Sequence, residues 1–354
     1  MKIEIGETGI LCERYCLVGD IGGTNTTIAL VGRKDARFHI VVKCIFETQQ
    51  ISDFMLPFRQ AVARISELNQ YKIPESCCLC AAGPIEANVC KQLTNARWGI
   101  DGNKIAAEFG FKTFLINDFT ALSFGIPILN TENEAEIVKM KNGDGSFPPP
   151  QGSVKAVIGA GTGLGVGFIT EVDGKTIAFP SEGGHLDFPA FDEETTALTS
   201  FTRKRLGAHP DLECFVSGIG LSYIFDFLYE TGNYEKTPLL KEILSLPPQN
   251  RPAMIAQNAE TDDLCFAAHR LFRKIYGKTA GNIAAVLLPK GGLYIAGGVI
   301  AKDWKLFLSD TVFSDAFSIN YKSNISALLK TIPIYIVRNY STSLIGAANA
   351  AYNL

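Results

Sequence analysis

One local pattern occurs twice in this 354-residue chain, and it restricts the possible folds more than any other feature. An apolar run leads into a glycine-rich polar turn and a second apolar run follows at once, over residues 15–31 and again over residues 157–169. Each copy predicts a β-hairpin with a glycine-rich tip. Neighbouring glycines let a ligand approach the backbone closely, and the amides of such a turn can bind an anion. An ordinary hairpin turn would also accept two glycines, so the tips alone leave the function open.

A third strand is expected after each hairpin, over residues 38–46 and 176–179. The repeat therefore predicts two similar α/β domains that face each other across a cleft, each offering one glycine-rich tip. A segment rich in glycine and proline, residues 142–152, indicates an exposed loop near a domain boundary. We expect a small domain of residues 1–128 plus 338–354 and a large domain of residues 129–337.

A polar pair, Asn117-Asp118, ends the apolar run of residues 113–116. The run predicts a buried strand that leads into a helix. Ligands of open α/β sheets lie at the carboxyl ends of the strands, so Asp118 is a candidate base. The alternative is that Asp118 only caps the next helix, because Asp and Asn are favoured N-caps.

Two further segments carry glycine pairs. Glu182-Gly183-Gly184-His185 places a carboxylate and an imidazole around a flexible backbone, which favours a binding loop over a structural histidine. Residues 293–300 predict a buried strand ending in two glycines, Gly297-Gly298, a third use of the same device.

Several classes of protein are disfavoured. The net charge of -3 and the scattered Lys and Arg residues argue against a nucleic-acid partner. No N-terminal leader and no apolar run of about 18 residues is visible, which predicts a cytoplasmic protein with no membrane segment. Nine cysteines, an odd number, fit a reducing compartment. The Cys-x-x-Cys spacing of Cys77 and Cys80 lacks the other ligands of a zinc site, so we expect buried strand residues and assign no metal ligands. The Gly-Lys-Thr tripeptides at 174–176 and 277–279 lack the glycine that a P-loop requires.

Seven motifs together resemble the bacterial-type glucokinase family, ATP-dependent hexokinases with an actin-like (ribonuclease H-like) ATPase fold. They follow the family's order and span most of the chain. The motifs are Asp20-Ile21-Gly22-Gly23-Thr24-Asn25, Leu93-Thr94-Asn95-Ala96-Arg97-Trp98, Ile116-Asn117-Asp118-Phe119, Gly159-Ala160-Gly161-Thr162-Gly163-Leu164-Gly165, Glu182-Gly183-Gly184-His185, Ser217-Gly218-Ile219-Gly220-Leu221 and Ala296-Gly297-Gly298. One departure is Ser181, where the family commonly has glycine.

The resemblance implies phosphorylation of glucose at its 6-hydroxyl with ATP and Mg²⁺, and a homodimer. Asp118 would be the base. The sugar hydroxyls would be bound by six residues, namely Asn95, Asn117, Asp118, Glu182, His185 and Glu213. The nucleotide would be bound by two phosphate loops and a loop beside adenosine, namely Asp20, Gly22, Gly23, Thr24 and Asn25, then Gly161, Thr162 and Gly163, and finally Gly297 and Gly298.

The residue types agree with this chemistry. Phosphoryl transfer needs mainly positioning and charge stabilisation, which backbone amides, a magnesium ion and one base can supply. A buried hexose needs a partner for each hydroxyl. Two alternatives remain: a kinase of another hexose on the same fold, and a non-catalytic sugar-binding regulator. Regulators of the related ROK group usually carry an N-terminal helix-turn-helix and a Cys-rich zinc motif, which this sequence lacks. We also expect Trp98, in a polar loop, to leave solvent when sugar binds. The alternative is that Trp98 is a fixed core residue.

Overall fold

The computed structural model describes residues 1–6, 10–35, 37–68, 74–94, 96–179, 181–339 and 341–353. Two compact units divide the chain. The first comprises Met1–Leu129, Glu171–Pro180 and Tyr340–Leu354, and the second comprises Asn130–Thr170 and Ser181–Asn339. Each is described below by itself.

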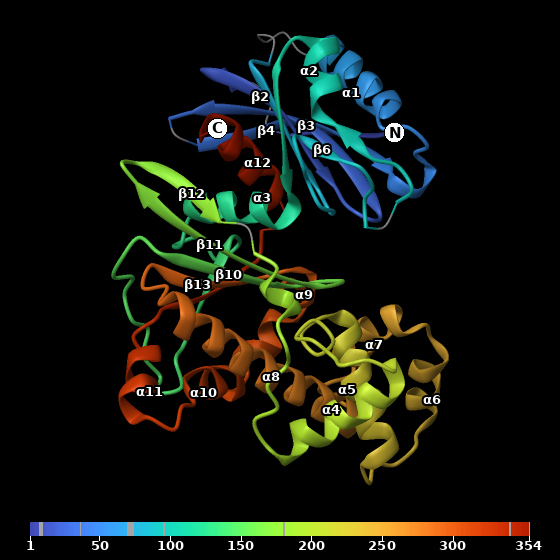
Figure 1. Cartoon of the computed structure of the whole chain (residues 1–354), viewed down its shortest axis with the longest axis vertical. Coiled ribbons are helices and arrows are strands. Elements are labelled where there is room, and N and C mark those ends of the chain that lie inside the picture. Colours follow the sequence, from blue (N-terminus) through green and yellow to red (C-terminus); the bar gives the residue numbers. More distant parts are fainter. Residues whose placement is uncertain are drawn as a thin grey trace. The chain divides into compact units, whose positions relative to one another are not determined.

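A six-stranded sheet with the order β1-β4-β3-β2-β5-β8 forms the centre of the first unit (Figure 1). Strands β2, β3 and β4 are antiparallel neighbours, whereas β2, β5 and β8 run parallel. The parallel strands are apolar over most of their length because helices cover both faces of the sheet. The strand bounds are β1 Lys2–Ile5, β2 Arg14–Ile21, β3 Asn25–Lys34, β4 Arg37–Glu47, β5 Ser76–Ala81 and β8 Lys112–Asn117, with a separate pair β6 Val89–Cys90 and β7 Ile100–Asp101.

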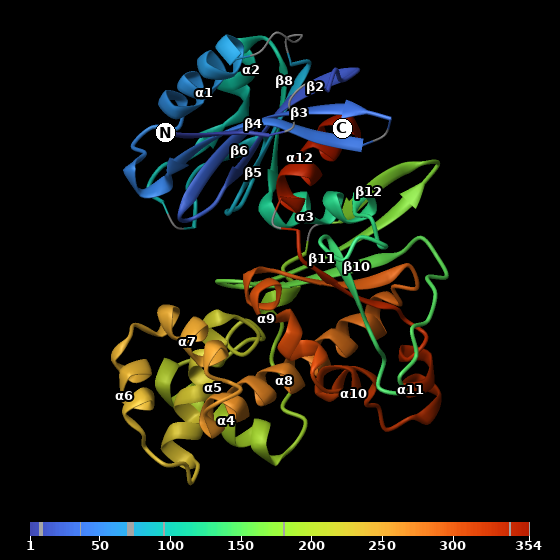
Figure 2. The same cartoon turned by 180° about the vertical axis from the view of Figure 1, so that it is seen from behind.

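Helices α1 (Met55–Leu68) and α2 (Gly102–Phe109) cover one face of this sheet, and α3 (Asp118–Gly125) and α12 (Thr342–Asn353) cover the other. Figure 2 shows α3 and α12 side by side. Small residues allow this close approach: a Cβ atom on Gly346 would lie 1.8 Å from the carbonyl oxygen of Ala121. The last helix of the chain is thereby held against the helix that begins at Asp118.

The second sheet has the order β12-β11-β10-β13-β14-β9. Its first five positions repeat the arrangement β4-β3-β2-β5-β8, with the glycine hairpin followed by two parallel strands. The predicted repeat of the two halves is confirmed in the sheets. The strand bounds are β9 Ile137–Met140, β10 Lys155–Ala160, β11 Leu164–Val172, β12 Lys175–Phe179, β13 Gly292–Ala296 and β14 Ile334–Val337.

Helix α8 (Asp263–Leu287) is the central helix of the second unit. Its Tyr276 hydroxyl donates to the carbonyl of Ile158 in β10 at 3.1 Å. Its glycines let α10 pack closely, since a Cβ on Gly277 would lie 2.2 Å from a carbonyl oxygen of Phe313. The other helices are α4 Glu193–Leu206, α5 Gly218–Thr231, α6 Pro238–Ser245, α7 Arg251–Gln257, α9 Gly298–Leu308, α10 Val312–Ser318 and α11 Ser323–Leu329, and the 3₁₀ helices of the chain are η1 Thr48–Gln50, η2 Ile126–Ile128, η3 Gly183–His185 and η4 Pro248–Asn250.

An ion cluster around the buried carboxylate of Asp226 joins the helices α4, α5 and α7. Asp226 of α5 accepts from Arg205 at 2.7 Å and from Arg251 at 2.8 Å. Two arginines around one carboxylate offset the loss of its hydration, so the three helices are held in one arrangement.

The predicted buried strand before the glycine pair is confirmed: β13 ends at Ala296, and α9 begins at Gly298. One sequence prediction is wrong. Trp98 is only 8% exposed and stacks on Phe54 at 5.7 Å between ring centroids. Its ring belongs to the core of the first unit, so it has little solvent contact to lose.

The cysteine prediction is confirmed. Cys77, Cys78 and Cys80 are fully buried in β5, and all nine cysteines are free thiols. Among the described residues, no cluster of three His, Cys, Asp or Glu side chains could hold a metal ion. None of the described helices combines the length and apolar character of a membrane span.

Candidate functional site

The parallel strands β2, β5 and β8 end at one edge of the first sheet, where they bring two candidate residues together. Asp20 pairs with Cys80, and Asn117 pairs with Ala81, the next residue of β5. Asp118 follows Asn117 directly, and the charge of Asp20 reaches it and raises the pKa of its carboxyl. Residues far apart in the sequence thus form an acidic pair at the carboxyl ends of parallel strands, the usual place of a ligand site.

Asn117, not Asp118, is the N-cap of α3. Its Oδ1 accepts from the backbone N–H of Phe119 at 2.9 Å and of Thr120 at 3.4 Å. Asp118 is the first residue of the helix, and its Oδ1 accepts from Phe119 N–H at 2.8 Å. Asn117 therefore fills the cap position that the alternative assigned to Asp118.

The pKa of the Asp118 carboxyl is raised, chiefly because burial disfavours its charged form. The hydrogen bond from Phe119 opposes this, and the negative charge of Asp20 adds to it. A carboxylate whose pKa is raised is a stronger base than an exposed one, which suits proton abstraction from a hydroxyl.

Asp20 lies under similar constraints. Burial raises the pKa of its carboxyl, and a hydrogen bond from Ser343 partly offsets this. The Ser343 hydroxyl, in α12, donates to Oδ2 of Asp20 at 2.5 Å. The Cys80 thiol donates to the carbonyl of Gly19 at 2.9 Å, so the end of β2 is held from both sides.

In the second unit, the turn between β10 and β11 contains Gly161, Thr162 and Gly163. Gly161 N–H donates to Gly163 O at 2.9 Å, and its own carbonyl accepts from Gly218 N–H at 2.9 Å. Gly218 is the first residue of α5, whose N-cap is Ser217. The turn therefore lies against the N-terminus of a helix, where the unpaired amides favour anions.

Glu213 connects this turn to the sugar candidates. Its Oε2 accepts from Leu164 N–H at 2.8 Å. A Cβ on Gly163 would lie 2.3 Å from the same oxygen, so a side chain there would displace the Glu213 carboxylate. Glu213 N–H in turn donates to Gly184 O at 3.0 Å, which fixes the glycine pair of the predicted binding loop.

His185, in η3, lies beside three carboxylates. Its Nδ1 is 2.9 Å from Oδ2 of Asp211. That hydrogen bond is the largest cause of the raised pKa of His185, and the charges of Glu213 and Glu182 add to it. Glu182, His185 and Glu213 are thus brought together. Asp211 was missed from the sequence, because no local motif marks it.

Gly297 lies between β13 and α9, and Gly298 is the first residue of α9. Because β10 and β13 are parallel and Gly159 pairs with Ala296, this loop emerges at the same edge as the turn of Gly161. Gly297 has a φ of 96°, and a Cβ there would lie 2.3 Å from Ala160 O. The backbone of this loop therefore depends on glycine.

The remaining predicted site residues are those of the first glycine turn and Asn95. Gly22, Gly23, Thr24 and Asn25 form the turn between β2 and β3, with Thr24 and Asn25 exposed. Asn95 lies outside the described residues.

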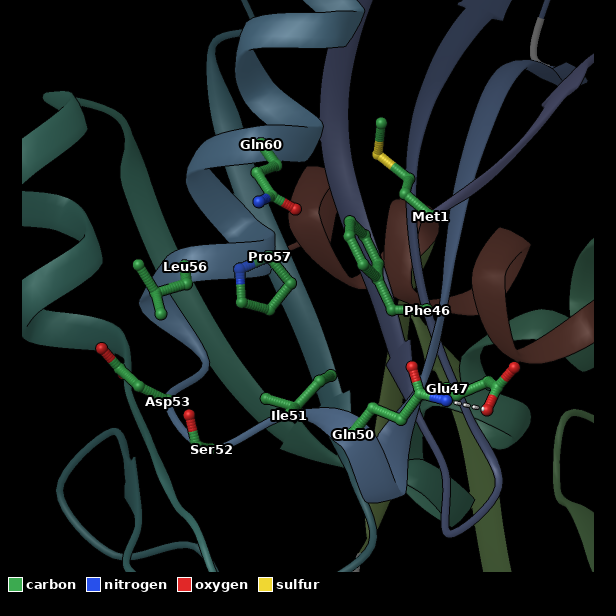
Figure 3. A pocket seen from close by; sticks show the side chains of 10 residues that line it. All are labelled: Met1, Phe46, Glu47, Gln50, Ile51, Ser52, Asp53, Leu56, Pro57 and Gln60. Carbon is green, nitrogen blue, oxygen red and sulfur yellow. Dashed lines mark hydrogen bonds between the residues drawn. The ribbon is translucent and has the colours of Figure 1, made fainter.

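A cavity of about 210 Å³ in the first unit is lined by none of the predicted site residues. Figure 3 shows Phe46 and Glu47 on one side of it and Leu56 and Pro57 on the other, with Gln50 donating to Glu47 at 2.6 Å. It lies beside η1, whose Gln50 is among its lining residues.

Comparison with known proteins shows the family. A family model described as Glucokinase matches residues 17–354. A glucokinase of Nostoc punctiforme is 34% identical, over 96% of this chain and 99% of its own. The crystal structure of a glucokinase from an Antarctic psychrotroph is similar with a TM-score of 0.79 and 28% identity, covering 96% of this chain and 99% of that one. The structure of glucokinase from Balamuthia mandrillaris in complex with glucose has a TM-score of 0.75 and 23% identity, covering 96% and 94%. These similarities confirm the predicted actin-like α/β fold class.

Proposed function

The chain belongs to the glucokinase family of glucose-phosphorylating transferases, and we propose that it transfers the γ-phosphoryl group of ATP to the 6-hydroxyl of D-glucose. The products are glucose 6-phosphate and ADP. The observation that carries the proposal is the half-buried acidic pair at the ends of β2 and β8, in which Asp118 has a raised pKa and is not the helix cap.

Asp118 is proposed to take the proton of the 6-hydroxyl as the phosphoryl group is transferred. The oxygen then attacks the phosphorus while ADP leaves, so the proton, the new O–P bond and the broken P–O bond balance. The raised pKa of Asp118 and its fixed place at the start of α3 support this role. The positive end of the α3 dipole would favour Asp118 as a carboxylate.

The sugar is proposed to be held by Asn95, Asn117, Asp118, Glu182, His185 and Glu213. The Oδ1 atom of Asn117 is used by the helix cap, so its amide N–H groups are the ones left to donate to a hydroxyl. The raised pKa of His185 favours its protonated form, a donor at both ring nitrogens, one of which faces Asp211. Ordered donors and acceptors of this kind bind a polyhydroxylated ring.

The nucleotide is proposed to lie on three glycine-containing loops. The turns at Gly22-Gly23-Thr24 and Gly161-Thr162-Gly163 would bind phosphates through amides, and Gly297-Gly298 would border adenosine. Mg²⁺ prefers oxygen ligands and is usually bound by one or two carboxylates together with substrate phosphates. Asp20 fits such a role, because one carboxylate oxygen is held by Ser343 and a second negative charge, Asp118, lies nearby. The ion would offset phosphate charge.

Three wider properties belong to the same proposal. The chain would act in the cytoplasm, which its nine free cysteines support. It would form a homodimer, which light scattering of the purified protein tests. The two domains, residues 1–128 plus 338–354 and residues 129–337, would close on the sugar.

A coupled assay with a panel of hexoses and phosphoryl donors tests the proposal. We expect glucose with Mg-ATP to give the highest kcat/KM. A higher value with another hexose would favour a kinase of that sugar. Tight sugar binding without turnover for every donor would favour the non-catalytic regulator.

A further inference from the structure

Three consecutive carbonyl groups of the first glycine turn are held by η1, the short helix that follows β4. Two of the three donors are side chains of η1, and the third is a backbone N–H. The bonds are Thr48 Oγ1 to Gly22 O at 2.8 Å, Gln49 Nε2 to Gly23 O at 3.1 Å and Thr48 N to Thr24 O at 2.9 Å.

The direction of each carbonyl fixes the direction of the next amide. In a planar trans peptide, the C=O of one residue and the N–H of the next point in opposite directions. Carbonyls turned toward η1 therefore direct the N–H groups of Gly23, Thr24 and Asn25 away from it. Glycine peptides would otherwise rotate easily, because glycine has no side chain to restrict them.

The Thr48 hydroxyl both donates and accepts a hydrogen bond. It lies 3.0 Å from Oγ1 of Thr26, and both threonines are fully buried. Since its one proton goes to Gly22 O, it accepts the proton of Thr26. The resulting relay runs from Thr26 through Thr48 to Gly22, and a side chain of the same shape without a hydroxyl cannot replace it.

We propose that Thr48 and Gln49 are positioning residues for the nucleotide phosphates. They keep the partly negative carbonyl oxygens of the turn away from an anionic ligand and turn the amides toward it. The inference rests on the proposed function, in which this turn is a phosphate loop. Neither residue belongs to a glycine motif, and both lie more than 20 positions along the chain from the turn.

Two substitutions remove the donors with little change of shape, Thr48→Val and Gln49→Met. Thr48→Ser keeps the hydroxyl. Gln50→Met is the matched control, because Gln50 is the next residue of η1 and its side chain donates to Glu47 rather than to the turn. The measurements are calorimetric Kd values for ATP, adenosine and glucose, with thermal unfolding to establish that each variant is folded.

We expect Thr48→Val and Gln49→Met each to lower the affinity for ATP roughly 3- to 10-fold, the range that one lost hydrogen bond gives. Adenosine, which has no phosphate, and glucose should bind as to the wild type, and Thr48→Ser and Gln50→Met should bind ATP normally. Unchanged ATP affinity in both donor variants would overturn the proposal, and so would equal weakening of ATP and adenosine. A wild type that binds ATP but phosphorylates no hexose would refute the proposed function, while the ATP and adenosine titrations would still test the positioning role.

Discussion

Ser343 donates a 2.5 Å hydrogen bond to Oδ2 of Asp20, a residue 323 positions earlier in the chain. The bond joins α12 to the carboxyl end of β2, where Asp20 of the acidic pair lies. Burial raises the pKa of the Asp20 carboxyl, and this hydrogen bond lowers it, so Ser343 helps to keep Asp20 ionised.

Removing this hydroxyl should impair the enzyme most at low pH. In Ser343→Ala, the pKa of Asp20 loses a lowering influence and rises further, so the acid limb of the kcat/KM profile for ATP should move to higher pH. At neutral pH we expect a loss of roughly 10- to 100-fold, as for a hydrogen bond to a charged group. Ser341→Ala is the control, because the Ser341 hydroxyl accepts from Lys43, whereas that of Ser343 donates to Asp20. An acid limb unchanged in Ser343→Ala would show that the hydroxyl has no such effect.

The acidic pair should also reduce the stability of the unliganded protein. The folded-state pKa of Asp118 is raised, so its ionised form destabilises the fold above that pKa, and the penalty vanishes below the unfolded value near 3.8. Asp118→Asn should therefore raise the unfolding temperature at pH 7.5 and give a smaller gain as the pH falls toward 4. Thermal unfolding without ligands measures both. A lower unfolding temperature at pH 7.5 would be inconsistent with a desolvated carboxylate.

Two substitutions at Glu213 separate its two contacts. In Glu213→Gln, the amide oxygen can still accept from Leu164 N–H, so the second glycine turn should keep its shape and only the sugar should be affected. We expect the binding free energy of glucose to weaken by ~1–3 kcal/mol, as for a buried hydrogen-bond partner left unmatched, and the affinity for ATP to stay nearly unchanged. Glu213→Ala removes both contacts and should weaken ATP as well. Equal losses of glucose and ATP affinity in Glu213→Gln would place Glu213 in the nucleotide site instead.

The loop after β13 offers a matched pair of glycines. In Gly297→Ala, the new Cβ would lie 2.3 Å from Ala160 O at a φ of 96°, so the loop must shift. A Cβ on Gly298 would meet no atom within 4 Å. Gly297→Ala should raise the KM for ATP several-fold and lower the unfolding temperature, since strain of this kind costs about 1–3 kcal/mol. Gly298→Ala should keep the wild-type unfolding temperature, and a loss as large as that of Gly297→Ala would contradict the steric argument.

The glycine turns and the sheets could be predicted from the sequence because their signals are local. Apolar runs around Gly22-Gly23 and Gly161 predict hairpins, and Asn117-Asp118 marks a strand end. The start of α9 was missed because Val299 and Ile300 continue the apolar run of β13, and only the positive φ of Gly297 separates strand from helix.

The supporting residues of the site could not be predicted in this way. Ser343, Thr48 and Asp211 form hydrogen bonds to residues 323, 26 and 26 positions away, and serine, threonine and aspartate are common in many other roles. Such contacts follow from the register of strands and the packing of helices. The same holds for Trp98, whose polar neighbours in sequence gave no sign of its stacking on Phe54.

The central claim is that Asp118 is the base of a glucose kinase. Asp118→Asn keeps the size of the side chain and an oxygen for Phe119 N–H, but it cannot accept the proton of the sugar hydroxyl. The direct test is the kcat of this variant with saturating glucose and Mg-ATP, together with the calorimetric Kd for glucose. The account predicts a kcat lower by a factor on the order of 10²–10⁴, with glucose still bound. Turnover within a few-fold of the wild type would contradict it.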